Sequence, residues 1–544
     1  MPRYILSAEA DKIQDLVFRS AHLRQVVGGS QLLTRFCRQE APRLLAQLRR
    51  HQLDGAAIAA VRQDIIVADG GSFTVLFDTP EEAHTYGRLL AQLYYETTGS
   101  SLTVAYPVAW GGAAADFSTA NVESRRALAA AKRQGRPAAA EAHLPYAAFC
   151  SSCGVAPAER YEALHEKEMA NYLCRSCREK SRARDQKGIA FLLEFLAAVV
   201  GESEEAADWK WPDEAEALTG GWDERRYVAY LVADGNGMGR VFEQCPSPDK
   251  LRELSRALGD VLRASLAEPT RQLMARARPY EVPVLPLILG GDDVFALLPA
   301  PCALDFARSF CLQYEERMGA KLRELGLCAQ PTMAAAVVIC KASYPYALAH
   351  QHGERLLRHA KRLSKTVAAE HPQAAPHSMV HFDTVLGSRI AGVDTWPGDH
   401  RPTLRPYWVV ADPSQDLLPT GAGLPLDRLL DGRLDIDPHP QRRLAQLQAL
   451  FAPDRLPTDD SMARWRASLE RVVGRAVERG QEEDAGVLRQ VLNYLGGEEH
   501  GWYRVRRAGE DYAGHGLPDL LEMWDWSEKL TADPRLYEGK EARR

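Results

Sequence analysis

Two apolar runs, residues 284–289 and 294–298, are separated by only four residues, Gly290-Gly291-Asp292-Asp293. A connection this short between two strand-like runs requires the chain to turn back on itself as a β-hairpin. Glycine at the turn puts no Cβ between the backbone and a bound group, so a phosphate can approach closely. The sequence therefore predicts a hairpin with two carboxylates at its tip, and the surrounding fold must present that tip.

The hairpin lies inside a regular order of predicted elements. Residues 227–233 form an uninterrupted apolar run that ends at Asp234, which indicates a fully buried strand. The other elements are helical sequence at 248–278, a helix at 304–325, a strand at 332–340, a helix at 346–363 and a last strand at 379–382. The core order is β-α-β-β-α-β, the ferredoxin-like order of polymerase palm domains.

The N-terminal part repeats this order around a second double-glycine turn. Its elements are a strand at 3–8, helical sequence through residue 50, strands at 58–67 and 73–77, a helix at 81–97 and a strand at 101–107. Matching the glycines sets Gly70-Gly71-Ser72-Phe73 against Gly290-Gly291-Asp292-Asp293, and Glu9-Ala10-Asp11 against Ala233-Asp234-Gly235. On this alignment the N-terminal copy keeps the turn and has lost the carboxylates. We expect an α+β protein with one degenerate and one competent palm.

The three aspartates of the second copy suit metal-ion catalysis. Asp292 and Asp293 at the hairpin tip would lie beside the strand end that carries Asp234. Such a cluster can hold two divalent ions, Mg²⁺ or Mn²⁺, about 3.5–4 Å apart, which activate an attacking hydroxyl and stabilise a leaving pyrophosphate. The alternative is an ordinary hairpin turn and a solvated aspartate. The glycine-rich segment 234–239 and the long apolar strands favour the catalytic interpretation.

Two C-x-x-C pairs lie between the copies: Cys150 and Cys153, then, after a spacer of twenty residues, Cys174 and Cys177. Four thiolates at this spacing favour a closed, tetrahedral and structural Zn²⁺ site. The alternatives are unrelated cysteines or a redox pair.

These motifs together resemble one family over about residues 1–390. The segments 231–239 and 289–293 resemble the first-strand motif and the signature turn of the catalytic palm in the large, polymerase-like subunit of type III CRISPR effector complexes. The segments 13–18, 23–24 and 28–33 resemble the start of that subunit's non-catalytic palm, and the cysteine pairs between the palms match as well.

The resemblance implies an activity. In that family, binding of target RNA switches on conversion of ATP to 3′–5′ cyclic oligoadenylates, which activate separate defence nucleases. It implies ATP as substrate, with backbone subunits, guide RNA and target RNA as partners.

The resemblance also implies roles for individual residues. Asp292 and Asp293 would bind metal and triphosphate, and Asp234 would be a further metal ligand. Nucleotide contacts are expected from Gly235, Asn236, Gly290, Gly291 and Lys361, and from Gly28, Gly29 and Ser30 in a second pocket of the first palm. Lys361 would neutralise the triphosphate, or be an ordinary surface lysine of a helix.

The sequence departs from the family's pattern at two points. Asn236 stands where an aspartate is usual, so its carbonyl would bring less charge to a metal. Many relatives carry an N-terminal histidine-aspartate nuclease domain, whereas here the first palm is expected to begin at residue 3 and no His-Asp pair occurs. We therefore expect no DNA cleavage by this chain.

The predicted domains are a degenerate palm at 1–140, a zinc module at 141–190, a helical linker at 191–222, a catalytic palm at 223–390 and a mainly helical domain at 391–544. In the last, 396–426 is expected to be irregular and helices are expected at 441–451, 460–478, 482–495 and 517–526. Trp502, Trp524 and Trp526 are interpreted as core residues, the alternative being a platform for stacking bases.

Composition excludes some classes of protein. A net charge of −6 argues against binding nucleic acid over the whole surface. No signal peptide or membrane span is expected, which indicates a cytosolic protein. Two other functions remain open: a standalone cyclase that makes a cyclic dinucleotide without guide RNA, and a catalytically silent scaffold subunit.

Overall fold

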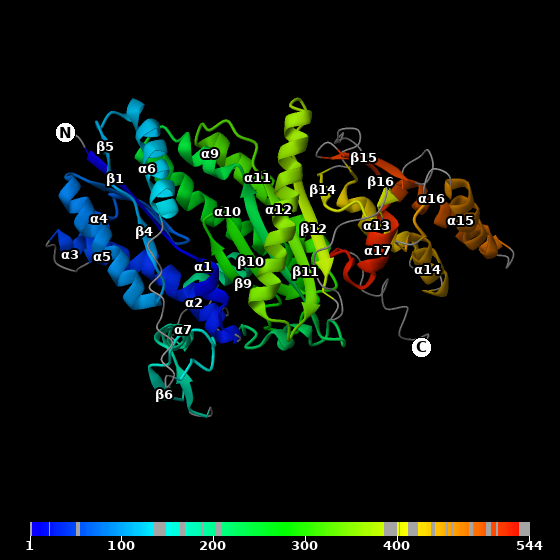
Figure 1. Cartoon of the computed structure of the whole chain (residues 1–544), viewed down its shortest axis with the longest axis horizontal. Coiled ribbons are helices and arrows are strands. Elements are labelled where there is room, and N and C mark those ends of the chain that lie inside the picture. The colour runs from blue at the N-terminus through cyan, green and yellow to red at the C-terminus, as the bar shows by residue number, and fades with distance from the viewer. Residues whose placement is uncertain are drawn as a thin grey trace.

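The computed structural model describes residues 3–20, 22–49, 55–134, 148–163, 169–185, 190–201, 209–385, 400–401, 403–411, 423–436, 441–452, 455–457, 461–477, 482–496, 502–507 and 510–531. Figure 1 shows an elongated molecule with the N-terminal sheet at one end, the larger sheet in the centre and the C-terminal helices at the other end. Most of the predicted irregular connection at 396–426, and parts of 141–190 and 191–222, lie outside the described residues. No helix in the described part of the chain is long and apolar enough to cross a membrane.

The first sheet has the strand order β2-β3-β1-β4, and β5 also pairs with β1. Its strands are β1 (Arg3–Ala10), β2 (Ile65–Asp69), β3 (Ser72–Phe77), β4 (Leu102–Val104) and β5 (Val108–Trp110). Its helices are α1 (Ile13–Phe18), α2 (Leu23–Arg35), a π-helical turn (Phe36–Glu40), α3 (Ala41–Leu48), α4 (Gly55–Val61), α5 (Pro80–Thr98) and α6 (Ala114–Gln134).

One prediction in this region is wrong. The strand expected at 58–67 begins only at Ile65, because Gly55–Val61 forms helix α4. Four of these seven residues are alanine, which favours a helix over a strand.

The second sheet has the order β14-β12-β11-β8-β10-β9. Strands β9-β10-β8-β11 therefore repeat the order β2-β3-β1-β4 of the first sheet. The bounds are β8 (Tyr227–Asn236), α9 (Met238–Glu243), α10 (Pro248–Met274), β9 (Leu285–Gly290), β10 (Asp293–Pro299), α11 (Ala303–Glu324), β11 (Thr332–Lys341), α12 (Tyr346–Glu370), β12 (Ser378–Thr384) and β14 (Tyr407–Val409). The elements expected for this part of the chain occur in the expected order, whereas α9 and β14 were not predicted.

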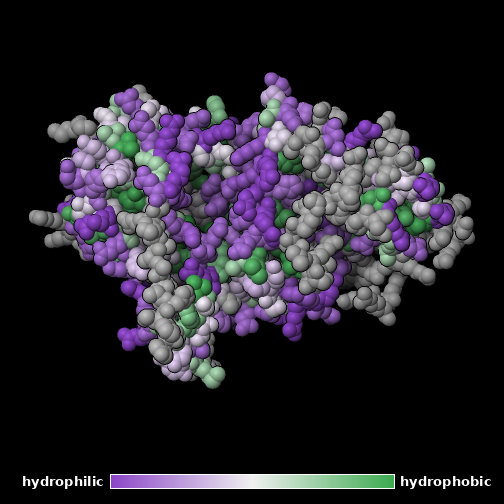
Figure 2. All heavy atoms as spheres, viewed as in Figure 1, coloured by the Kyte–Doolittle hydropathy of each residue, from purple (hydrophilic) through white to green (hydrophobic). Residues whose placement is uncertain are grey.

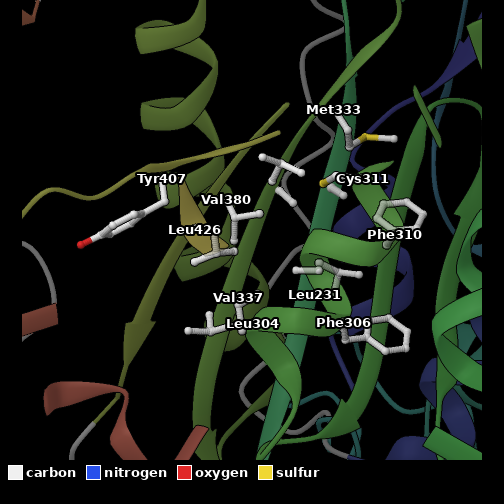
Figure 3. Packing of buried hydrophobic residues seen from close by; sticks show 14 of the residues in the cluster. Leu231, Leu304, Phe306, Phe310, Cys311, Met333, Val337, Val380, Tyr407 and Leu426 are labelled. Atoms are coloured by element: carbon white, nitrogen blue, oxygen red, sulfur yellow. The ribbon is translucent and has the colours of Figure 1, made fainter. Parts of the chain in front are cut away.

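Strand β8 is covered on both faces, which explains its uninterrupted apolar sequence. Ala229 and Leu231 face the core that contains α10 and α11, whereas Val228 and Tyr230 face the core that contains α12. Figure 3 shows Leu231 beside the side chains of α11. Burial on both faces holds the end of β8, and with it Asp234, in a fixed place.

The two palms share part of their cores. Ile5 and Ile66 of the first sheet belong to the same apolar cluster as Leu251 and Leu254 of α10. Arg252 adds a hydrogen bond from its Nε to Ile65 O at 3.3 Å. The palms are therefore packed against each other rather than only linked by the chain.

The four-cysteine segment projects from the body (Figure 1). It contains β6 (Arg160–Glu162), β7 (Asn171–Leu173) and α7 (Arg175–Asp185), and α7 packs along α2 of the first palm. The helix α8 (Ala190–Val200) and a 3₁₀ turn (Ala215–Thr219) lead from it to the second palm.

The C-terminal part is mainly helical, as predicted, but it also contains a small sheet that was not predicted. Its elements are β13 (His400–Arg401), α13 (Leu426–Ile436), α14 (Gln441–Gln448), a 3₁₀ turn (Ala449–Phe451), α15 (Met462–Val477), α16 (Glu482–Gly496), β15 (Tyr503–Arg507), β16 (Glu510–Gly514), α17 (Gly516–Glu522) and a 3₁₀ turn (Trp524–Trp526). The sheet has the order β13-β16-β15. Trp502, Trp524 and Trp526 are buried, as expected for core residues.

Candidate metal and nucleotide site

The three predicted aspartates meet at the end of the second sheet. Asp293, the first residue of β10, pairs with Asp234 of β8 and with Gly290 of β9, so Gly291 and Asp292 form the turn. Gly291 has a φ of 63°, a conformation that glycine adopts without strain. Carboxylate oxygens from Asp234, Asp292 and Asp293 all lie within 4.8 Å of one another.

The environment of this cluster disfavours three free negative charges. Burial, then the charge of Asp234, raises the pKa of Asp292 to about 6. The same two causes raise the pKa of Asp293 to about 8, although part of this residue is open to solvent. Carboxylates with these properties gain stability when a cation neutralises them. The residues therefore fit one or more divalent ions.

Lys361, which the resemblance assigns to the triphosphate, lies beside the carboxylates. Its ammonium forms an ion pair with Asp234 from the middle of α12. The side chain is thus part of the carboxylate cluster rather than a surface lysine. Figure 2 shows mainly hydrophilic residues over the centre of the visible face of the molecule.

The glycine-rich segment after Asp234 makes room for the hairpin tip. A Cβ on Gly235 would lie 2.7 Å from Met238 Cγ and 3.0 Å from Tyr314 Oη, and Asp292 Cβ would be 3.5 Å away. Glycine at 235 therefore allows Asp292 to lie against β8. The next residue, Asn236, donates from Nδ2 to Thr332 Oγ1 at 3.1 Å.

The backbone pairing corrects our alignment of the two palms by one residue. In the first palm, Ser72 pairs with both Asp69 and Glu9, as Asp293 pairs with both Gly290 and Asp234. Glu9 therefore stands at the position of Asp234, and Gly71 at the position of Asp292. The first palm has kept one carboxylate of the three.

Lys132 completes the likeness between the palms. It extends from α6 to Glu9, with Nζ 2.5 Å from Oε1, just as Lys361 extends from α12 to Asp234. Neither Glu9 nor Lys132 was predicted as a site residue. Finding these two residues requires the pairing register of the strands in both palms. Matching the double glycines aligned the palms one residue out of register.

Gly71 cannot carry a side chain. Its φ is 78°, and a Cβ there would lie 2.9 Å from Ala10 Cβ and 2.8 Å from Ile13 Cδ1. Ala10 occupies the position that Gly235 has in the second palm. The space that receives Asp292 in one palm is therefore filled in the other.

The two hairpins touch each other. Asp69 Oδ2 accepts a hydrogen bond from Gly291 N at 3.1 Å. A Cβ on Gly70 would lie 3.2 Å from Gly290 C, so the two turns are in backbone contact. Asp69 is a further residue of the site that sequence reasoning did not find.

The structure does not bring Gly28, Gly29 and Ser30 to the carboxylate cluster. They lie in the middle of α2, where all three are buried. A Cβ on Gly28 would lie 1.9 Å from Lys180 O of α7, and Ser30 Oγ donates to Leu287 O of β9. Close packing between helices accounts for glycine at position 28 without a nucleotide.

The four cysteines form one cluster at the base of the projecting segment. Their sulfurs lie within 4.8 Å of one another, and Cys153 Sγ and Cys174 Sγ are 3.9 Å apart. Thiolates around a tetrahedral zinc ion, with Zn–S bonds of about 2.3 Å, are about 3.8 Å apart. The cluster is compatible with a closed, structural zinc site.

The central part of the chain matches a known family. Residues 227–368 match the family model described as Cas10/Cmr2, second palm domain. This match covers the carboxylate cluster and Lys361. No curated protein sequence matches the chain.

Several solved structures are similar to this chain. Csm1 from T. onnurineus is 13% identical with a TM-score of 0.52, over 97% of this chain and 70% of that one. The Csm1-Csm4 cassette in complex with cA4 is 14% identical with a TM-score of 0.50, over 90% of this chain and 69% of that one. The cassette in complex with AMPPNP is 15% identical with a TM-score of 0.42, over 66% of this chain and only 53% of that one. The match to the family model identifies residues 227–368 as a palm domain of the Cas10/Cmr2 type.

Proposed function

We propose that this Cas10-like chain is a metal-dependent nucleotidyltransferase that converts ATP into a cyclic oligoadenylate. The observation that carries the proposal is the convergence of Asp234, Asp292 and Asp293 within a palm of the Cas10/Cmr2 type. A scaffold gains nothing from carboxylates that repel one another, whereas a metal-dependent enzyme needs them.

The reaction forms one phosphodiester bond at a time. The 3′-hydroxyl oxygen of one nucleotide attacks the α-phosphorus of another, the bond to the β-phosphate breaks, and pyrophosphate leaves while the hydroxyl proton passes to solvent. Ring closure repeats this step within the linear product. Mg²⁺ or Mn²⁺, when bound by the three aspartates, supplies activation of the hydroxyl and stabilisation of the leaving group.

The residues around the carboxylates have supporting roles. Lys361 pairs with Asp234 in the absence of nucleotide and supplies a positive charge for the triphosphate. Gly290 and Gly291 leave the hairpin backbone free of side chains beside the phosphates. A second nucleotide pocket in the first palm stays a prediction, and the pair Glu9 and Lys132 suits it better than the buried Gly28, Gly29 and Ser30.

The wider assembly is part of the proposal. We propose that both palms are ferredoxin-like copies, that the four cysteines bind zinc, and that the chain acts with backbone subunits, guide RNA and an activating target RNA. The shared sheet order of the palms supports the first point, and the spacing of the sulfurs supports the second. Csm1, which shares the fold, has been crystallised with Csm4.

The test is product formation from ATP with Mg²⁺ or Mn²⁺, with and without target RNA and partner subunits. Asp292→Ala with Asp293→Ala should abolish both pyrophosphate release and cyclic product, with the thermal unfolding midpoint preserved. Asp249→Ala with Asp260→Ala is the matched control, because it removes two exposed aspartates from the surface of α10. Full activity in the Asp292 and Asp293 variant would rule out the assigned site. Inactive wild-type protein under every condition would favour the scaffold.

A further inference from the structure

The helix α6 of the first palm lies beside the catalytic carboxylates of the second palm. It packs on β1, where Ser124 Oγ and Ser7 Oγ are 2.7 Å apart. It also contacts α9, where Asn121 Nδ2 donates to Phe242 O at 3.0 Å. Figure 1 shows α6 and α9 next to each other at one end of the central sheet. This helix therefore connects the two halves of the molecule at the site.

The start of α9 lies against Gly235 of β8, which Asp292 of the catalytic turn also approaches. Met238, its first residue, approaches Gly235 so closely that a Cβ there would lie 2.7 Å from Met238 Cγ, and Asp292 Cβ lies on the same side of Gly235. Phe242 follows Met238 by one helical turn. A side chain of α6 that reaches Phe242 is thus close to the carboxylate cluster.

Arg125 is that side chain. It lies one turn after Asn121 on α6, and its guanidinium carbon is 5.5 Å from the centre of the Phe242 ring. Burial lowers the pKa of the Arg125 guanidinium, while the charges of Glu243, Asp292, Cys245 and Glu9 act in the opposite direction. The arginine is therefore partly withdrawn from water and surrounded by carboxylates of both palms.

The guanidinium of Arg125 has no ion pair or hydrogen bond within the part of the chain that the structure describes. Other partly or fully buried arginines are different: Arg49, Arg308 and Arg405 each contact at least two carboxylates. None of the Arg125 nitrogens is both fully buried and without a partner in the described part of the chain, so water can still reach them. A ligand with acceptor oxygens can replace that water at the N–H donors.

The position of Arg125 indicates the chemical class of that ligand. The fork of a guanidinium matches two phosphate oxygens, and planar stacking on an aromatic ring orients the fork. A nucleotide triphosphate held at Asp234, Asp292 and Asp293 brings negative charge to this side of the hairpin. Lys361 approaches Asp234 from α12, which is an element of the second palm, whereas Arg125 comes from the first.

We propose that Arg125 is a nucleotide-binding residue that the first palm contributes to the second, where it contacts the phosphates of the nucleotide held at the three aspartates. The inference rests on the proposed function, since it requires a nucleotide at that site. With Arg125 in this role, phosphate binding in the second palm depends on the packing of α6 against α9.

The test is equilibrium binding of a non-hydrolysable ATP analogue to the full chain with Mg²⁺, together with steady-state kinetics. Arg125→Ala should weaken binding about tenfold or more, the loss expected for a charged phosphate contact of about 1.4 kcal/mol or more. The loss should be smaller for an ADP analogue and smallest for AMP. Arg125→Lys should recover part of the affinity. Arg126→Ala is the control, because Arg126 is the next residue on α6 and is exposed.

Two further measurements separate the possible outcomes. Arg125→Gln keeps most of the stem on Phe242 without the charge, so it decides the question if Arg125→Ala unfolds. Unchanged affinity and kinetics in Arg125→Gln would overturn the role of Arg125 while leaving the proposed function intact. Wild-type protein that binds no nucleotide and forms no product would overturn both. Equal losses for ATP, ADP and AMP would show a packing role on Phe242 and would also overturn the inference.

Discussion

Asp69 of the first palm accepts a hydrogen bond from the backbone N–H of Gly291, in the turn that carries the catalytic aspartates, with 3.1 Å between Oδ2 and N. These residues are 222 positions apart in the sequence. The contact means that the degenerate hairpin supports the catalytic one, and the effect of losing it can be measured.

Asp69→Ala should lower the rate of product formation about five- to tenfold, since a turn that shifts loses alignment of Asp292 and Asp293. The stability cost should be about 1 kcal/mol, the usual worth of one hydrogen bond. Asp69→Asn keeps an acceptor for Gly291 N and should retain most of the activity. Initial rates of pyrophosphate release check this, with thermal unfolding as the measure of stability. If Asp69→Asn is as impaired as Asp69→Ala, the negative charge rather than the hydrogen bond is what matters.

Asn236→Asp should be tolerated and should reduce the metal concentration needed for half-maximal activity by a few-fold. The first palm shows that aspartate fits, because Asp11 stands at the matching position and accepts from Ser101 Oγ at 2.9 Å. Thr332 Oγ1, which now accepts from Asn236, can donate to an aspartate instead. Titration of Mg²⁺ and Mn²⁺ against the rate checks this. A higher metal requirement in the variant would show that residue 236 does not face the ions.

The purified protein should contain close to one zinc ion per chain, and Cys174→Ser should remove it. Loss of the metal should destabilise the projecting segment and the packing of α7 on α2, lowering the unfolding midpoint without changing a chemical step. Elemental analysis and thermal unfolding measure the two effects. Cys328→Ser is the control, because Cys328 is exposed and distant in sequence from the cluster. Protein prepared without chelator that contains no zinc would contradict the assignment.

His350 should make the contact between the palms sensitive to acid. It stacks on Phe18 of the first palm, with ring centres 4.6 Å apart, and burial lowers its pKa to about 4. Because the folded state holds this histidine neutral, the unfolded chain binds the proton first. Stability from this group is therefore complete above about pH 6.5 and is lost as the pH falls towards 4, by about 3 kcal/mol at most.

The matching variant is His350→Phe, which keeps the ring and removes the titration. Glu354 is the facing acid, with Oε1 3.9 Å from His350 Nε2, and Phe295 is the other ring against it. The variant should lose less stability than wild type between pH 6.5 and pH 4.5 when unfolding is followed with denaturant. Equal losses in both proteins would show that His350 does not cause the acid sensitivity.

The parts of the site that depend on local sequence were predictable. The hairpin at 290–293 was predicted from its length and its glycines. Strand β8 was predicted from its uninterrupted apolar run, which is typical of a strand that is buried on both faces. Family resemblance suggested Lys361 as a triphosphate ligand, but its ion pair with Asp234 was not predicted, because nothing local links a helix residue to a strand end 127 positions earlier.

The parts that depend on contact between the palms were not predictable from one sequence. Nothing in the local sequence distinguishes Asp69 and Arg125 from other charged residues, because their positions at the site depend on the packing of the two palms. The wrong alignment of the two palms has a different cause. Their double glycines were matched with each other, whereas the backbone pairing shows that Gly71, rather than Ser72, is equivalent to Asp292. The small sheet β13-β16-β15 was missed because its strands are short and two of them are rich in charged residues.

The first palm has Ala10 at the position equivalent to Gly235, and this difference bears on the evolution of the two palms. If both palms descend from one duplicated ancestor, the first palm has kept Glu9 and Lys132. An acidic residue at position 71 would then restore a second carboxylate at the position equivalent to Asp292. That residue is barred, because Ala10 Cβ would lie 2.9 Å from the new side chain's first carbon and the backbone φ of 78° is open only to glycine at low cost. Reversion would need at least two changes, neither useful without the other. A single substitution at position 71 therefore could not return the lost carboxylate to the first palm.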